Sequence, residues 1–202
     1  MNPINSSGSY APLEQSYLRE EKLRDAGFRF FGNNVRISDT CTIVGVDNIN
    51  IGDDVTIDSG TVLNCNSGSI TIGNFVHIAS ACYLNGAGTI VLGDFCNLDS
   101  GTCIYSATDD YLGETLTDPT SPEEELDGVK CAPVQLGKHV ITGAGAVILP
   151  GCRIGEGSSI GAMSLVTKDL DGWGVFSGVP AKRLKDRSRA LLELERLLLC
   201  RE

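Results

Sequence analysis

Apolar residues recur at every sixth position through most of the chain, and a small or acidic residue usually follows each of them. A period of six matches neither the alternation of an ordinary strand nor the roughly 3.6-residue turn of an α-helix. A short fixed repeat instead indicates a β-solenoid, in which each coil buries its apolar face only by stacking on the next coil. The repeat positions are Ile37, Ile43, Ile51, Ile57, Leu63, Ile72, Ile78, Leu84, Leu92, Leu98, Ile104, Leu136, Thr142, Ile148, Ile154, Ile160 and Val166.

Three six-residue units make one coil, with a few additional residues at one corner. The repeat residues Ile51, Ile72 and Leu92 stand 21 and 20 positions apart. The additional residues, Cys65–Ser69 and Gly86–Gly88, are mostly Gly, Ser and Asn, as expected of corner turns. The sequence therefore predicts an all-β solenoid shaped as a triangular prism, with three short strands in each coil.

The repeat divides the chain into five parts. A helix from Pro12 to about Ala26, with Phe28, Phe30 and Phe31 after it, is expected to close the open end of the first coil. The long acidic interruption of the repeat is unusual for a compact domain, and such segments are often functional. An amphipathic helix with a leucine stripe ends the chain and must pack on the prism wall or on a partner subunit. The parts are a helical cap (1–32), coils (33–104), an acidic loop excursion (105–133), further coils (134–170) and a C-terminal segment with its helix (171–202).

The composition excludes several classes of function. A formal net charge of −10 argues against a nucleic-acid surface, because phosphate binding needs positive charge. No apolar run approaches the roughly 20 residues of a membrane span, and no leader is visible, so we expect a cytoplasmic protein. None of the eight cysteines forms a C-x-x-C pair or a zinc-ligand spacing, so no metal is expected. Cys82, Cys96 and Cys152 each precede a repeat residue by two positions and should be reduced, buried thiols.

Three C-terminal segments carry a resemblance to a known family. VILPGCRIGEGSSIGA, SLVTKD and SGVPAKRLK, together with the six-residue period, resemble the hexapeptide-repeat acyltransferase superfamily. The likeness is strongest to maltose, galactoside and nodulation-type O-acetyltransferases and to enzymes that acylate sugars of bacterial surface polysaccharides. The resemblance implies a left-handed parallel β-helix, a homotrimer with active sites between adjacent subunits, and acetyl-CoA as co-substrate.

The same resemblance implies which residues bind the cofactor. Small side chains let the thin pantetheine arm of CoA lie along a strand edge, and lysines suit its phosphates. The residues at the matching positions are Ala144 and Ala162 beside the arm, Thr167 and Lys168 near the phosphates, and Lys182 and Lys185 as further basic groups.

The catalytic base is where the sequence departs from the family pattern. Maltose and galactoside acetyltransferases carry a histidine at the position that Asp109 occupies here, and an ordinary aspartate is a weaker base at neutral pH. Of the two histidines, His77 lies in a V-H-I-A-S segment that resembles the catalytic segment of more distant acyltransferases. His77 should project outward and could accept a proton, and either His77 or Asp109 could be the base. His139 is expected at the surface.

The acceptor is predicted less sharply. Three residues of the neighbouring coil and of the excursion could bind a sugar acceptor, namely Asn85, Asp110 and Tyr111. The leading hypothesis is acetyl transfer to a hydroxyl or amino group of a sugar or sugar nucleotide. A drug-acetylating enzyme and a non-catalytic scaffold remain open, whereas a carbonic anhydrase needs three histidines and the chain has two. The sequence does not decide between O- and N-acylation, or between acetyl and longer acyl groups.

Overall fold

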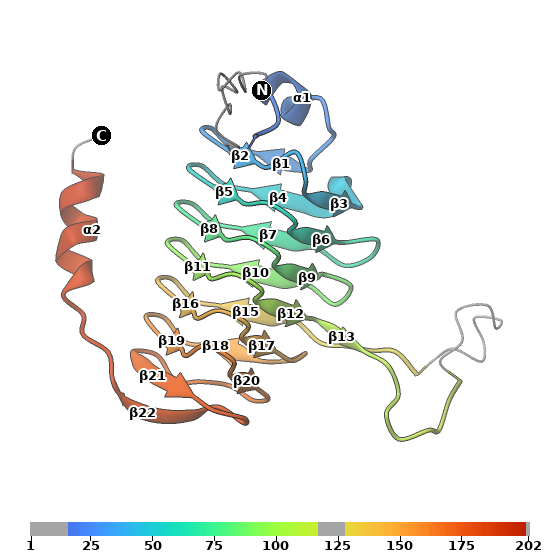
Figure 1. Ribbon diagram of the computed structural model, residues 1–202, viewed down its shortest axis with the longest axis vertical. Coiled ribbons are helices and arrows are strands. Elements are labelled where there is room, and N and C mark those ends of the chain that lie inside the picture. The colour runs from blue at the N-terminus through green and yellow to red at the C-terminus, as the bar shows by residue number, and fades with distance from the viewer. Residues whose placement is uncertain (1–15, 117–127, 201–202) are drawn as a thin grey trace, which may run out of the picture.

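The computed structural model describes residues 16–116 and 128–200, and these form a parallel β-solenoid with three flat faces (Figure 1). Each coil contributes one strand to each of three sheets, in the order first, second, third. The first sheet holds β1 (Phe30–Phe31), β4 (Ile49–Ile51), β7 (Ile70–Ile72), β10 (Ile90–Leu92), β15 (Val134–Leu136) and β18 (Arg153–Ile154). The second holds β2 (Arg36–Ile37), β5 (Thr56–Ile57), β8 (His77–Ile78), β11 (Asn97–Leu98), β16 (Ile141–Thr142), β19 (Ser159–Ile160), β21 (Gly174–Ser177) and β22 (Lys182–Asp186). The third holds β3 (Thr42–Val44), β6 (Val62–Asn64), β9 (Tyr83–Asn85), β12 (Cys103–Tyr105), β17 (Val147–Ile148) and β20 (Leu165–Val166).

The strand register stacks the repeat residues in columns, as the six-residue period predicts. In the first sheet Ile51 pairs with Ile72, Ile72 with Leu92, and Leu92 with Leu136. These side chains are at most 2% exposed. Each buried Ile or Leu stabilises the fold by about 1.5–3 kcal/mol, so the columns are its main source of stability. The solenoid prediction is confirmed.

The three cysteines predicted to be buried lie in the core of the solenoid. Cys82, Cys96 and Cys152 are each 1% exposed, and all eight cysteines are free. Burial raises the pKa of the Cys96 thiol to about 12 and the pKa values of Cys82 and Cys152 to about 11. A thiol that stays protonated at neutral pH is a poor nucleophile, so these three cysteines fill space in the core.

The N-terminal helix is shorter than the sequence predicts. Helix α1 spans Glu20–Arg24, and the predicted first turn at residues 12–15 lies outside the described residues. Before the helix, Tyr17 forms a β-bridge with Ser38, and the Leu18 N–H donates to Ile37, so this segment is extended along the first coil. Pairing with the coil thus overrides the local helix propensity. Leu23, 2% exposed, covers the end of the core.

The aromatic residues after α1 also differ in part from the prediction. The sequence predicts that Phe28, Phe30 and Phe31 close the open end of the first coil, but Phe30 and Phe31 form strand β1, the first strand of the first sheet. The rings of Phe28 and Phe31 lie 5.3 Å apart and pack against the core, whereas Phe30 is 58% exposed.

The acidic excursion leaves the solenoid as an arm between β12 and β15 (Figure 1). Its base is an antiparallel pair, β13 (Ala107–Thr108) with β14 (Lys130–Cys131). Residues 117–127 lie outside the described part. The arm therefore begins next to the corner where each coil passes from the third sheet to the first.

The C-terminal segment extends the second sheet and then turns back beside the solenoid. Strands β21 and β22 continue the sheet beyond residue 170, and helix α2 (Leu191–Leu199) runs alongside the coils (Figure 1). None of its residues is fully buried, and Leu194 is 68% exposed. Glu195 of this helix contacts His139, which is only 7% exposed. The prediction that His139 lies at the surface is therefore wrong.

Candidate active site

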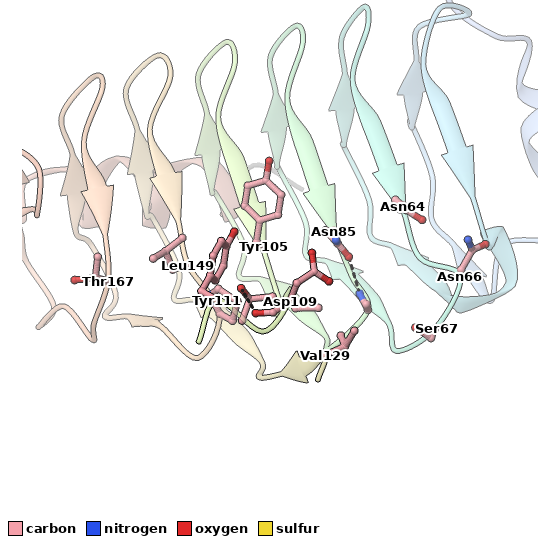
Figure 2. A pocket seen from close by; sticks show the side chains of 14 residues that line it. Asn64, Asn66, Ser67, Asn85, Tyr105, Asp109, Tyr111, Val129, Leu149 and Thr167 are labelled. Carbon is pink, nitrogen blue, oxygen red and sulfur yellow. Dashed lines mark hydrogen bonds between the residues drawn. The ribbon is translucent and has the colours of Figure 1, made fainter. Parts of the chain in front are cut away.

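A cavity of about 880 Å³ opens at the corner between the third and first sheets, under the base of the arm (Figure 2). Strands β6, β9 and β12 of the third sheet bury their central residue, so the last residue of each of these three strands points outward. This alternation places Asn64, Asn85 and Tyr105 in one outward row, in register with one another. The corner turns extend the row, and the lining also includes Asn66, Ser67, Ala87, Leu149, Pro150 and Thr167.

The arm supplies the charged side of this cavity. Asp109 follows β13 directly, and Asp109, Tyr111 and Val129 all line the cavity. Figure 2 shows the arm placing Asp109 and Tyr111 beside Tyr105 and Asn85 of the third sheet. The cavity thus combines one carboxylate with amide and phenol groups, a set that can bind a polyhydroxylated or amino-bearing molecule. Three predicted residues, Asn85, Asp109 and Tyr111, meet here.

Asp110 points into its own loop instead. Its carboxylate accepts N–H bonds from Leu112 (2.9 Å), Glu114 (2.5 Å) and Thr115 (2.9 Å), and the Thr115 hydroxyl lies 3.3 Å away. The Asp110 side chain is 9% exposed. The Leu112 N–H and its neighbours lower the pKa of the Asp110 carboxyl below its ordinary value. Asp110 therefore orders the loop that carries Asp109 and Tyr111.

We expect Asp110→Asn to lower kcat/KM about tenfold, because the amide replaces an acceptor by a donor and loosens Asp109 and Tyr111. Amide hydrogen exchange at Glu114 and Thr115 should rise in the variant. Since the folded pKa of Asp110 is lowered, the wild-type loop is ordered above the ordinary carboxyl pKa and loses that order as pH falls through the lowered value. Equal exchange in both proteins at neutral pH would contradict this role.

His77 lies on a different face. It projects outward from β8 in the second sheet, as predicted, and its side chain is 44% exposed. The His77 Nε2 atom is 2.8 Å from Asp58 Oδ2, and Asp58 also accepts a bond of 3.1 Å from the Tyr17 hydroxyl. These residues border a separate hollow of about 450 Å³ together with Phe75. Within one chain, His77 and Asp109 are not brought together.

Asp58 is a partner that the sequence analysis missed. It belongs to the preceding coil, 19 positions before His77. The repeat holds a signal for it, because Thr56 and His77 are in register across the sheet, and Asp58 lies two residues further along the chain. A carboxylate that holds a histidine ring in place is the base-plus-orienter arrangement of many transferases and hydrolases.

The predicted cofactor residues lie in the C-terminal coils, and several of them are exposed. Ala144 and Ala162 stack in successive coils at the corner between the second and third sheets, where the Met163 N–H donates to Ala144 O at 2.8 Å. A Cβ on Gly143 would lie 2.5 Å from the Ala162 nitrogen, so the coils meet closely at this corner. Ala144 and Ala162 are both exposed there and carry only a methyl group each, which leaves room beside the backbone for an extended, thin ligand.

The remaining cofactor candidates are spread around the lower coils. Thr167 lines the cavity, and Lys168, next to it, is exposed. Lys182 and Lys185 are exposed on β22, at the outer edge of the second sheet. The third sheet therefore separates Thr167 from the corner formed by Ala144 and Ala162, and the candidates do not converge on one point within a single chain.

Comparisons with known proteins agree with this architecture. The family profile described as bacterial transferase hexapeptide (six repeats) matches residues 133–168. Over 180 residues the chain is 39% identical to the dTDP-4-amino-4,6-dideoxy-D-glucose acyltransferase of Escherichia coli, a match that covers 89% of this chain and 93% of that protein. The chain belongs to the hexapeptide-repeat acyltransferases.

Solved structures of this family superpose closely on the chain. AntD, an N-acyltransferase from Bacillus cereus in complex with dTDP and 3-hydroxybutyryl-CoA, gives a TM-score of 0.86 at 41% identity, covering 92% of this chain and 97% of AntD. A variant of AntD in complex with dTDP-4-amino-4,6-dideoxyglucose and coenzyme A gives 0.87 at 40% identity, covering 93% and 99%.

Family membership confirms the predicted fold and the predicted enzyme class, and it argues against one alternative. The fold is the left-handed parallel β-helix, and the chain is an acyltransferase, so the non-catalytic scaffold is disfavoured.

Within residues 16–116 and 128–200, no helix is long and apolar enough to cross a membrane. In the same residues, no group of three or more His, Cys, Asp or Glu side chains could hold a metal ion.

Proposed function

We propose that this acyltransferase moves an acyl group from an acyl-CoA to the amino group of a dTDP-linked amino sugar. The observation that carries the proposal is the cavity in which Asp109 lies among the amide and phenol groups of Asn85, Tyr105 and Tyr111. A carboxylate in an otherwise neutral polar cavity suits an ammonium group better than a plain hydroxyl. The names of the relatives support the same acceptor class, and they support N- over O-acylation.

The chemistry assigns a task to each group. The amino nitrogen attacks the thioester carbonyl carbon, a C–N bond forms, and the C–S bond then breaks to release CoA as its thiol. Asp109 binds the ammonium form, which releases one proton to solvent before the nitrogen can attack. Asp109 then accepts the second proton, which the nitrogen loses as the C–N bond forms, and can return it to the departing sulfur. Backbone N–H groups at the coil edge would stabilise the oxyanion. Asn85 and Tyr111 would bind the sugar through hydrogen bonds.

We propose that CoA lies along the corner formed by Ala144 and Ala162, with Thr167, Lys168, Lys182 and Lys185 near its phosphates. The two small side chains leave the coil edge open, and the lysines offset the negative charge of the cofactor in an acidic protein. Acetyl-CoA is the donor that the resemblance to sugar acetyltransferases favours.

A homotrimer would complete the site. In one chain the third sheet separates Ala144 and Ala162 from the cavity that holds Asp109. An adjacent subunit that presents one corner to the cavity of its neighbour would bring both sets together. The same packing is required for His77 to act on the acceptor, since His77 faces away from the cavity of its own chain. The sugar product would serve surface-polysaccharide synthesis in the cytoplasm, where the free thiols stay reduced.

A binding and turnover experiment tests the function. Acetyl-CoA at a hundredfold excess over Kd should stabilise the protein by about 2.7 kcal/mol, seen as a higher melting midpoint. Release of free CoA thiol should then depend on dTDP-4-amino-4,6-dideoxyglucose, and the matching 4-hydroxy sugar should be a poor acceptor. A higher melting midpoint with acetyl-CoA but no thiol release with the amino sugar would contradict the proposed acceptor. An unchanged melting midpoint would contradict the proposed donor.

A further inference from the structure

Polar contacts join helix α2 to the solenoid. Glu195 forms an ion pair with the Lys138 ammonium group, and its other oxygen is 2.7 Å from His139 Nε2. The His139 ring stacks on Phe95 at 5.0 Å, and the Lys138 ammonium lies 5.4 Å from the centre of the same ring. Helix α2 has no fully buried residue, and Glu195 makes its ionic contacts with the solenoid, beside the half-buried Leu191 and Leu192.

Arg187 fastens the segment that leads into the helix. Its Nη1 group donates to three carbonyl oxygens of the solenoid, those of His139 (2.8 Å), Gly157 (3.0 Å) and Ser158 (3.3 Å). Its backbone N–H donates to Trp173 O at 2.8 Å. Arg187 follows β22 directly, and it contacts the same residue, His139, that receives Glu195. The two contacts therefore form one polar clasp, made of Glu195, Arg187, Lys138 and His139.

The strand before the clasp is held at its start and by Arg183, whose guanidinium group lies 5.5 Å from the centre of the Phe176 ring, but its C-terminal end has fewer contacts. Strand β22 is the edge strand of the second sheet, every one of its residues is exposed, and in the part of the chain that the structure describes it pairs only with β21. That pairing is irregular, because the register shifts between Val175 and Phe176. An edge strand with ladder bonds on one side and no buried side chain is marginally fixed. Ala181, just before β22, is 4% exposed, and its N–H donates to Leu165 O at 2.8 Å, so the start of the strand at Lys182 is held by the solenoid. The position of Lys185, near the other end, depends more on what restrains the chain after it.

We propose that Glu195 is a positioning residue for cofactor binding. By holding α2 against Lys138 and His139, it keeps the C-terminal end of β22, which carries Lys185, at the edge of the second sheet. Figure 1 shows β22 leading into the segment that ends in α2. This inference rests on the proposed function, since that proposal gives Lys182 and Lys185 to CoA. Glu195 itself does not touch the cofactor, so its loss should weaken acyl-CoA binding and spare the chemical step.

The experiment compares Glu195→Gln with Glu193→Gln in the full-length protein. Glu193 is the matched control, because it lies on the same helix and, among the described residues, its carboxylate pairs with Arg196, three residues further on. We expect Glu195→Gln to raise the KM for acetyl-CoA about three- to tenfold, with kcat and the KM for the amino sugar within about twofold. Trypsin should cut after the basic residues of the 182–189 segment faster than in wild type. Glu193→Gln should change neither quantity.

The outcomes separate this inference from the proposed function. A normal KM for acetyl-CoA in Glu195→Gln, while wild type binds and uses the donor, would overturn the positioning role alone. Equal losses of kcat and of affinity for both substrates would also overturn it, because they would indicate general damage. Wild-type protein that fails to bind acetyl-CoA in the melting experiment would overturn both.

Discussion

Asp109→Asn is expected to lower kcat about 10²-fold, one of the largest effects on turnover of any single exchange in the cavity. The amide has nearly the same shape as the carboxylate, so the neighbouring Asn85 and Tyr111 keep their places. It cannot accept the proton of an attacking amine, and it binds an ammonium group weakly. Turnover should be measured as CoA thiol release at saturating donor and acceptor.

The control for this exchange is Glu114→Gln. Glu114 is an exposed carboxylate of the same arm, outside the cavity lining, and should leave kcat within about twofold of wild type. His77→Ala is the decisive comparison. If Asp109→Asn turns over normally while His77→Ala loses about 10²-fold, the base is His77 held by Asp58, supplied across a subunit boundary.

The fold was largely predictable because the period of the repeat sets the length of each strand and turn of the backbone. A six-residue period with an inward Ile or Leu fixes which residues share a column, and the register of Ile51, Ile72 and Leu92 follows from it. The polar corner Cys65–Ser69 was predictable on the same ground, since it is what remains between two strands of known period. It now lines part of the cavity.

The contacts that shape the candidate site were harder to predict, because they join distant positions or depend on one turn. Asp58 reaches His77 from the preceding coil, and Glu195 reaches His139 from 56 positions away. No local pattern reveals that a C-terminal helix buries His139. Asp110 is adjacent to Asp109 and of the same type, yet the turn at Leu112–Thr115 directs its carboxylate inward.

The helix prediction at the N-terminus failed for a similar reason. Periodic apolar residues favour a helix from Pro12, and local propensity supports it. Within the described residues, however, the first coil leaves an unpaired edge beside Ser38, and Tyr17 bonds there in extended form. Sheet pairing supplies backbone hydrogen bonds that fraying helix ends lack, so the helix begins only at Glu20.

Ile78→Ala is expected to lower the free energy of unfolding by about 3–4 kcal/mol, the largest stability effect we predict. Ile78 is fully buried in the column of the second sheet, in register with Ile57 above and Leu98 below. Removing three carbons there leaves a cavity between stacked coils, which the short strands cannot close without losing register elsewhere. Denaturant unfolding followed by circular dichroism should show a lower midpoint with a similar slope.

Ile141→Ala is the matched control for that exchange. Ile141 lies on the same sheet, in strand β16, but on the outward face, where it is 36% exposed. Ile141→Ala should lower the free energy of unfolding by less than about 1 kcal/mol, because less buried apolar surface is lost and no enclosed cavity is left. Similar losses for both variants would mean that the outward face of the second sheet is covered in solution. In that case the same face, which also carries His77, would be a subunit interface, and His77 would be placed to meet the cavity of a neighbouring chain.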